Sequence, residues 1–286
     1  VGSERCIRDR SLEYFRLSQD KGEYSESFWQ IRNEWLQKNL SVIFIGFVAV
    51  FILYKLLRFI DRKKNIFSSL KLFFVKLSRV KLINDLLFLK YMLFHPIDGY
   101  YEIRRKNRIS LVSATVLYIY LFFLEIFKIF FTGFIFSSVS VYRVNLFEVA
   151  AGIYLPVAVL LLSNYLISEI NSGEGRLRDI YTAGAYALAP YLVFEPFLII
   201  ISNVLTYNEA FLYTFPQYVV IGWTLILLFL MVKQIHNYTV GEAVKNILLT
   251  LFMVFIIIII VFIIFVLFTQ EAEFLQSIFR EVILRE

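Results

Sequence analysis

The chain has 286 residues, of which 59% are hydrophobic and 18% aromatic, and its formal net charge is +6. Soluble domains average about 45–50% apolar residues, so this composition excludes an ordinary soluble protein. The stretch from Ile247 to Phe268 contains no charged residue, and roughly 20 apolar residues can cross the hydrocarbon core of a bilayer as a helix. The sequence therefore predicts an all-α, polytopic membrane protein.

The first 39 residues are polar and predict a region outside the membrane. They form two helical patterns joined at QDKGEYS, and Phe28, Ile31 and Trp35 share one face of the second. This pattern fits an extracellular helical stalk over 1–39, and equally the last helices of a helical-repeat domain. Because the chain begins VGSERC, without an initiator Met, we expect it to be the remainder of a longer protein.

Six apolar segments predict six transmembrane helices. They are Leu40–Ile60, Ile109–Phe136, Leu146–Ile167, Ile180–Ser202, Thr214–Val232 and Ile247–Phe268. The first is a separate anchor helix over 40–60, and the other five form one membrane domain over 109–270. The last segment, 271–286, has Phe274, Ile278 and Val282 aligned on one helical face and predicts an amphipathic tail.

The distribution of Lys and Arg predicts the orientation. From Lys55 to Arg108 there are fourteen basic residues and four acidic ones. Short loops rich in Lys and Arg stay in the cytoplasm, so this segment is expected inside. Threading the six spans from there places the basic-poor loop Val204–Tyr213 outside, together with both ends of the chain.

The segment 61–108 predicts a basic amphipathic linker on the cytoplasmic membrane surface. Such a helix can lie among lipid headgroups, where each Lys or Arg near anionic lipid contributes about 1 kcal/mol. The residues expected to face lipid are Lys71, Phe73, Phe74, Lys76 and Arg79. Anionic lipids on the cytoplasmic side are therefore expected partners.

A charged, glycine-flanked loop separates the third and fourth spans. Its expected residues of interest are Gly173, Glu174, Gly175, Arg176, Arg178 and Asp179. One interpretation is a tight turn in which the glycines adopt conformations closed to other residues, and in which Asp179 caps the next helix. The other is a docking loop for a cytoplasmic partner.

The fourth span begins with unusually small side chains. Ala183 and Ala187 lie four residues apart beside Gly184, and small residues at this spacing allow another helix to approach closely. Pro190 and Pro196 are expected to bend or break the same span.

Three charged residues lie inside predicted spans: Glu125, Lys128 and Glu195. A charge at the bilayer centre costs about 2.5–3.5 kcal/mol on insertion scales. The spacing of Glu125 and Lys128 predicts that these two pair on one helical face. Glu195 has no partner nearby in sequence, so we expect it to face the bundle interior, lie at an interface or be protonated.

Three stretches show a family resemblance: Phe94–Tyr118, Ser163–Phe194 and Lys233–Thr250. With five spans following a cytoplasmic entry, the region from Phe94 to about Thr269 resembles the Yip (Ypt-interacting protein) membrane-domain family, particularly its bacterial branch. The chain departs from the eukaryotic members by its added first span and its N-terminal extension.

The resemblance implies a role in membrane organisation. Eukaryotic members look like vesicle-traffic adaptors that bind prenylated Rab-type GTPases. Bacterial members similar to this chain often lie among genes for carbohydrate ABC importers. The resemblance thus implies a bacterial plasma (inner) membrane location and an accessory or scaffold role beside an ABC-importer permease.

An enzyme is not expected. His95 and His236 are the two histidines and Cys6 is the one cysteine, so no zinc site with usual spacing can be assembled. No glycine-rich nucleotide motif follows a strand, and neither a cofactor nor a nucleic-acid partner is expected. The leading hypothesis is a non-catalytic scaffold or accessory subunit. The alternatives are a transporter or channel that uses Glu195 near the Pro-broken helix, and a lipid-organising or trafficking adaptor.

Overall fold

The computed structural model describes residues 2–64, 76, 79–106, 108–137 and 144–283. Over these residues all regular structure is helical, and six helices are long and apolar enough to cross a membrane. The prediction of an all-α, polytopic membrane protein is therefore confirmed.

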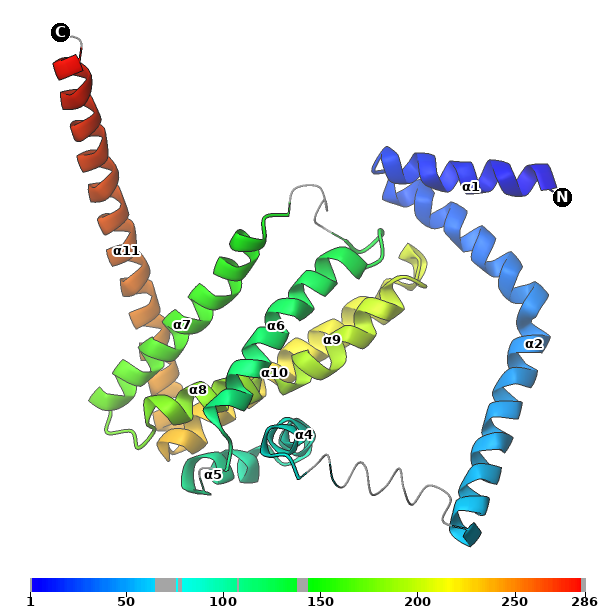
Figure 1. Ribbon diagram of the computed structural model, residues 1–286, viewed down its shortest axis with the longest axis horizontal. Coiled ribbons are helices and arrows are strands. Elements are labelled where there is room, and N and C mark those ends of the chain that lie inside the picture. The colour runs from blue at the N-terminus through cyan, green and yellow to red at the C-terminus, as the bar shows by residue number, and fades with distance from the viewer. Residues whose placement is uncertain (1, 65–75, 77–78, 107, 138–143, 284–286) are drawn as a thin grey trace.

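A bundle of transmembrane helices forms the centre of the molecule (Figure 1). Its helices are α6 (Leu111–Phe131), α7 (Leu146–Ile170), α8 (Leu177–Ala187), α9 (Ala189–Ser202), α10 (Phe211–His236) and α11 (Val240–Ile283). The short helix α8 contacts six other helices, namely α4, α5, α6, α7, α9 and α10. The side chains of α8 from Thr182 to Ala187 are all buried, so the core of the bundle is built around this helix.

The fourth span is two helices rather than one. Helix α8 ends at Ala187 and α9 begins at Ala189, with Leu188 as the break between them. Pro190 lies in the first turn of α9, where its missing N–H group costs little. Pro196, in contrast, is accommodated inside α9. The expected break thus occurs at the first proline only.

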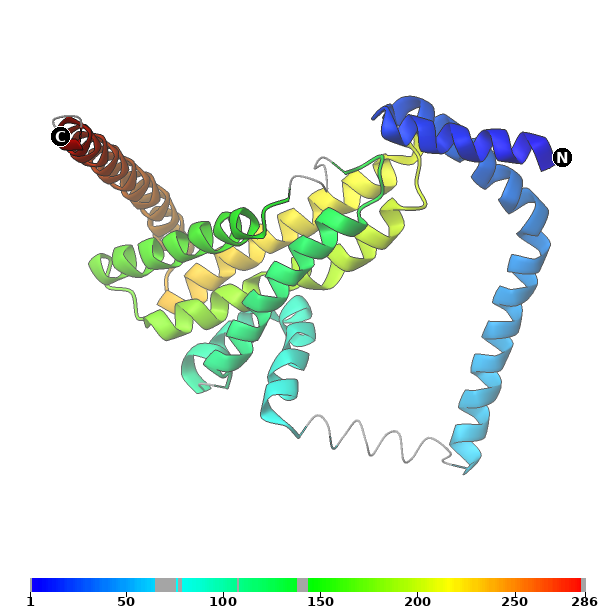
Figure 2. The same cartoon turned by 45° about the horizontal axis from the view of Figure 1, so that its top comes forward.

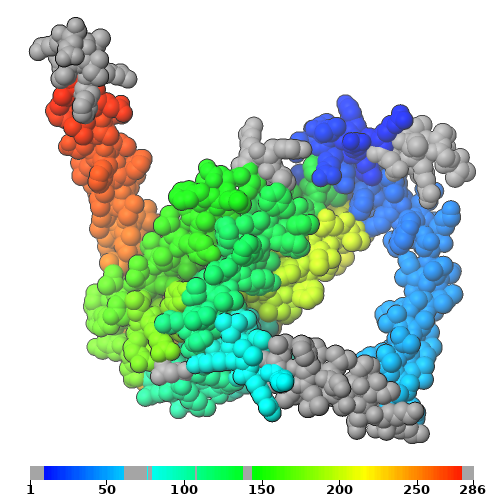
Figure 3. Space-filling view, in the orientation of Figure 1, coloured from blue at the N-terminus to red at the C-terminus, as the bar shows by residue number. Residues whose placement is uncertain are grey.

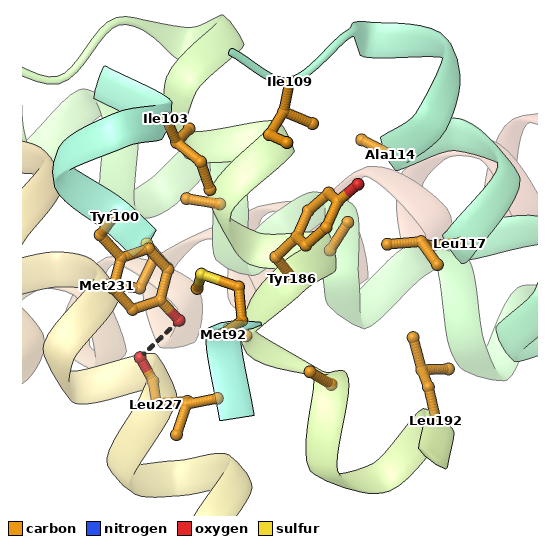
Figure 4. Close-up of a cluster of buried hydrophobic side chains, with 14 of the residues drawn as sticks. Met92, Tyr100, Ile103, Ile109, Ala114, Leu117, Tyr186, Leu192, Leu227 and Met231 are labelled. Atoms are coloured by element: carbon orange, nitrogen blue, oxygen red, sulfur yellow. Dashed lines mark hydrogen bonds between the residues drawn. The ribbon is translucent and has the colours of Figure 1, made fainter. Parts of the chain in front are cut away.

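Two further helices close one end of the bundle, which we call the basic end. Helices α4 (Lys81–Phe94) and α5 (Pro96–Lys106) bury Met92 and Tyr100 completely. The Tyr100 hydroxyl donates a 3.0 Å hydrogen bond to the Leu227 carbonyl of α10 (Figure 4). This burial holds the pKa of Tyr100 well above its ordinary value.

The segment 61–108 was expected to be a basic amphipathic linker on the membrane surface, and within it α4 and α5 bury apolar residues in the bundle. Helix α5 packs against α8 and α10 and helix α4 against α8, an interior contact that the basic pattern did not show. The membrane-surface location of the segment stays a prediction. Of the residues expected to face lipid, Lys76 and Arg79 are exposed. Lys71, Phe73 and Phe74 lie outside the described residues.

The N-terminal region forms two helices, α1 (Gly2–Leu17) and α2 (Lys21–Lys64). The Asp20 carboxylate accepts hydrogen bonds from the N–H groups of Gly22 and Glu23, both at 3.1 Å, and so caps the start of α2. Because α2 runs from Lys21 to Lys64 without interruption, the second stalk helix and the anchor span form one continuous helix. Every residue from 40 to 60 is exposed, and Figures 1 and 2 both show this part of α2 apart from the bundle.

Helix α2 joins the bundle at the end opposite the basic end (Figure 3). The Arg32 guanidinium binds both carboxylate oxygens of Glu209, at 2.6 and 2.7 Å, and donates to the Val204 carbonyl at 2.5 Å. The Tyr207 N–H donates to the Ser25 hydroxyl at 2.8 Å. We call these bonds the N-terminal contact. It places the start of α2 and the loop after α9 at the same end of the bundle.

Loss of the N-terminal contact should increase the flexibility of both segments that form it, the start of α2 and the loop after α9. A bidentate Arg–carboxylate pair combines charge with fixed geometry, so Arg32→Gln is expected to raise deuterium uptake at residues 21–36 and at residues 204–210. Hydrogen–deuterium exchange of the protein in nanodiscs measures this. Lys38→Gln removes a charge from an exposed position of the same helix and should leave both segments unchanged. Equal uptake in the Arg32 variant and the wild type would contradict the prediction.

The same contact should depend on pH. The hydrogen bond from Arg32 holds the pKa of Glu209 below its ordinary value. A carboxylate with a lowered pKa stabilises the folded contact above its ordinary pKa, and this contribution is lost as the pH falls through the lowered value. After correction for the intrinsic pH dependence of amide exchange, the protection factors of residues 204–210 should therefore be high at neutral pH and should fall as the pH drops below the ordinary Glu pKa of about 4.3.

Candidate functional site

A buried polar network joins three spans at the basic end. His236 at the end of α10 contacts Asn164 of α7 through Nε2 and Oδ1 at 3.0 Å. Asn164 Nδ2 in turn donates to Asn246 Oδ1 of α11 at 3.0 Å. Because Asn164 offers its oxygen to the ring, His236 is assigned as the tautomer that donates from Nε2. All three side chains are at most 3% exposed.

The network continues towards the loop after α10. Asn246 Nδ2 donates to the Tyr238 hydroxyl at 3.4 Å, and the Thr250 hydroxyl donates to Asn246 Oδ1 at 3.4 Å. Burying an amide without partners costs a few kcal/mol, so these bonds tie α7, α10 and α11 to one arrangement. The sequence pattern did not reveal this network. Its sign in the sequence was Asn164, an amide within the predicted span Leu146–Ile167, whereas Asn246 lies just before the span that begins at Ile247.

The glycines of the charged loop fit against this network. A Cβ atom on Gly173 would lie 2.6 Å from the Tyr238 hydroxyl, and one on Gly175 would lie 2.6 Å from His236 Nδ1. No described glycine has a positive φ, and the left-handed residue of this turn is Ser172, at φ 56°. The expectation that the glycines supply unusual backbone conformations is therefore wrong. They are needed because the loop backbone approaches the His236 ring too closely for a side chain.

The acidic residue of the loop binds back to the protein. Glu174 forms an ion pair with Arg104 of α5 and accepts a 3.1 Å hydrogen bond from Asn237. Its Arg105 contact is longer, at 3.8 Å. The loop is thus held onto α5 and the end of α10, although Arg176 and Arg178 are exposed at its surface.

Asp179 was expected to cap α8, but it does not occupy the N-cap position. Arg176 occupies the N-cap position, and Asp179 is the third residue of the helix. Its buried carboxylate accepts from Arg176 Nε at 2.9 Å. The carboxylate still lies in the first turn, where it complements the positive end of the helix dipole.

The small side chains of α8 lie buried in the core of the bundle. Ala183 and Ala187 are completely buried. A Cβ atom on Gly184 would lie 2.9 Å from Leu161 Cδ2 of α7 and 3.0 Å from the Tyr118 hydroxyl of α6. Gly184 therefore marks the point at which α8 approaches both neighbouring spans.

The charged residues within the spans form a cluster between α6 and α9. Lys128 Nζ lies 2.7 Å from Glu195 Oε1 and 3.2 Å from the Tyr191 hydroxyl, which donates to Glu125. The predicted pair of Glu125 with Lys128 is therefore wrong, and Glu195 has the partner that sequence spacing did not show. The reason is that α9 brings Tyr191 and Glu195 against the charged side of α6.

Glu195 is sealed within the bundle. Its side chain is 0% exposed, whereas that of Lys128 is 26% exposed. The contact between Lys128 and Glu195 does not have hydrogen-bond geometry, and neither Glu195 carboxylate oxygen accepts a hydrogen bond. Charge attraction depends chiefly on distance, and at 2.7 Å we treat the two groups as an ion pair. The Lys128 ammonium thus offsets the charge of Glu195, while Glu125 accepts a hydrogen bond from the Tyr191 hydroxyl.

The histidines do not form a metal site with other described residues. His95 is exposed and packs its ring against Tyr91, at a centroid distance of 5.1 Å. His236 is buried in the polar network. Within the described ranges, no three His, Cys, Asp or Glu side chains come together as metal ligands.

Gly175→Ala should destabilise the basic end. The added methyl would lie 2.6 Å from two atoms of the His236 ring and 2.8 Å from Ile235 Cγ2. Such overpacking costs about 1–3 kcal/mol, so the thermal unfolding midpoint in detergent should fall. Gly152→Ala is the matched control because nothing lies within 4 Å of its added Cβ. Equal midpoints for the two variants would contradict the close approach.

Glu195→Gln should also lower the thermal midpoint, because it leaves Lys128 without its ion-pair partner. Removing one member of a buried pair costs about 3–5 kcal/mol, whereas replacing both by apolar residues is often neutral. The double variant Glu195→Leu, Lys128→Met should therefore be more stable than Glu195→Gln alone. Glu148→Gln, at an exposed position of α7, serves as the control. A double variant less stable than the single one would show that the charges do not act as a pair.

The comparison with protein families matches most of this bundle. The Yip1 domain model matches residues 90–263, which begin within α4 and end within α11. No curated protein and no solved structure is significantly similar to the chain. The matched region covers more than half of the chain, so the protein is a membrane protein that belongs to the Yip1 domain family.

Proposed function

We propose that the protein is a non-catalytic membrane scaffold or accessory subunit. The observation that carries this proposal is the exposure of two apolar spans. The most hydrophobic 18-residue windows of α2 and α11 have 0% of their residues buried. They contrast with the α8–α9 span, of which 56% is buried.

These spans offer long helical surfaces to other membrane proteins. Helix association within a bilayer depends on packing and polar contacts, since lipid and protein surfaces are both apolar. Helix α2 is held to the bundle by the N-terminal contact, and α11 by its polar residues near Asn246. Their remaining lengths are free to pack against helices of a partner.

The proposed partner is the permease of a bacterial carbohydrate ABC importer. The family resemblance supports this partner, and the exposed spans supply a surface of suitable chemistry. In this proposal the protein resides in the bacterial inner membrane with both termini outside. The loop of Gly173–Asp179 then faces the cytoplasm, where its exposed surface could dock a second partner.

A transporter is the second candidate. The observation that favours it is a buried carboxylate, Glu195, in α9 just beyond the break at Leu188, because discontinuous helices often bind ions or substrates. The ion pair with Lys128 and the complete burial of Glu195 weigh against it.

Co-purification from the native membrane tests the scaffold proposal. The full-length protein, carrying a C-terminal tag and extracted in mild detergent, should bring down ABC-permease subunits in fixed proportion. Replacing the exposed Phe44, Phe47 and Phe51 of α2 by Leu should lower that recovery, because it changes the shape of the surface while keeping it apolar. The same change at Phe123, Phe130 and Phe197, which are also exposed, should leave recovery unchanged.

Two results would overturn the proposal. One is a protein that emerges alone and homogeneous from its native membrane. The other is solute movement by the purified protein in liposomes that Glu195→Gln abolishes, which would establish the transporter instead.

A further inference from the structure

A groove opens on the surface of the bundle between α6, α7 and α8. Its volume is about 700 Å³, within the range of about 300–1,000 Å³ typical of ligand pockets. Its walls are apolar and include Ile119 of α6 with Ala158 and Leu162 of α7. All three residues are exposed and lie within membrane spans. The groove is therefore open to the acyl-chain region of a bilayer.

The tyrosines of the groove do not make its walls polar. The Tyr118 hydroxyl donates to the Tyr181 carbonyl at 3.1 Å, and the Tyr154 hydroxyl donates to the Tyr118 carbonyl at 3.2 Å. Their hydrogen-bonding capacity is used within the protein, so their rings face the groove as apolar surface. Such walls suit hydrocarbon chains and do not suit a free inorganic anion.

One end of the groove is polar and cationic. Arg178 lines the groove near the start of α8, and so do Thr115 and Tyr181, whose hydroxyls lie 3.0 Å apart. The arginines around it have carboxylate partners: Arg104 binds Glu174, Arg108 binds Glu102 and Arg176 binds Asp179. Within the described part of the chain, no carboxylate lies in ion-pair range of Arg178.

We propose that this groove binds one anionic phospholipid of the surrounding membrane. The acyl chains occupy the apolar walls, and the phosphate meets the Arg178 guanidinium, whose planar donors match phosphate geometry. The Thr115 hydroxyl already donates to the Leu111 carbonyl at 3.0 Å, so Tyr181 is the hydroxyl of this pair that can donate to the headgroup. A transmembrane helix of a partner would fill the walls but would leave the Arg178 charge uncompensated, so lipid fits the groove better.

This inference goes beyond the scaffold proposal and does not depend on it. The exposed spans of α2 and α11 are separate from the groove, which is formed by α6, α7 and α8 alone. A lipid at this position would link α7 to α6 and α8 at the basic end and could be retained whether or not a permease is bound.

Lipid titration of the purified full-length chain tests the proposal. Delipidated protein in detergent is titrated with phosphatidylglycerol or with phosphatidylcholine of the same acyl chains, and bound lipid is counted by native mass spectrometry. We expect one saturable phosphatidylglycerol site with about five-fold preference over phosphatidylcholine, the size of effect that one basic residue gives near anionic lipid.

Two variants separate the headgroup contact from the groove itself. Arg178→Gln should abolish the preference for phosphatidylglycerol, whereas Arg105→Gln, an equal charge change at the same end of the bundle, should preserve it. Ala158→Phe places a bulky ring at an exposed position of the wall and should reduce binding of both lipids. Thermal midpoints equal to that of the wild type establish that each variant is folded.

Three outcomes would overturn the proposal. They are an undiminished preference in Arg178→Gln, unsaturable binding of many equivalent lipids, and undiminished lipid binding in folded Ala158→Phe. If instead Ala158→Cys cross-links in native membranes only to a polypeptide, the occupant is a partner helix and the lipid assignment is wrong.

Discussion

The close approach of α8 to its neighbours is the constraint on which the rest of the bundle depends. In a bilayer, apolar side chains gain little by leaving lipid for protein, so packing at short range must hold helices together. The run from Ala183 to Ala187 provides this range, because Gly184 lies against Leu161 and the Tyr118 hydroxyl with no room for a Cβ atom. Helices α6 and α7 both meet α8 at Gly184.

Polar groups determine which arrangement the packed helices adopt. The network of His236, Asn164 and Asn246 joins α7, α10 and α11, while the cluster of Lys128 and Glu195 joins α6 and α9. Each group would be costly in hydrocarbon without its partner. Misplaced helices would leave these groups unpaired, so the two sets of contacts specify a particular bundle and do more than add stability.

The sequence was sufficient to predict the six spans, because continuous apolar length is a property of each segment alone. It also indicated the small residues of α8 and a break in the fourth span close to Pro190. It did not show that Glu195 pairs with Lys128, since that contact depends on how α9 packs against α6. The same limit applies to the contact of Gly175 with His236, because these residues are far apart in the chain. It also applies to α4 and α5, whose apolar residues enter the core although the segment is rich in basic residues.

Buried contacts and exposed helix surfaces lie in different parts of this molecule. The polar contacts and the close packing involve the helices from α4 to α10 and the start of α11. Helix α2 and the distal part of α11 are exposed along their membrane-spanning lengths. Helix α2 is fixed at one end by Arg32 and Glu209, so its position relative to the bundle depends on few bonds. Inside the bundle, Glu195 is fully buried beside Lys128. The exposed apolar surfaces lie on the outside of the bundle, along α2, along α11 and in the groove that ends at Arg178. In the scaffold proposal, the protein acts through what it binds at these membrane-facing surfaces.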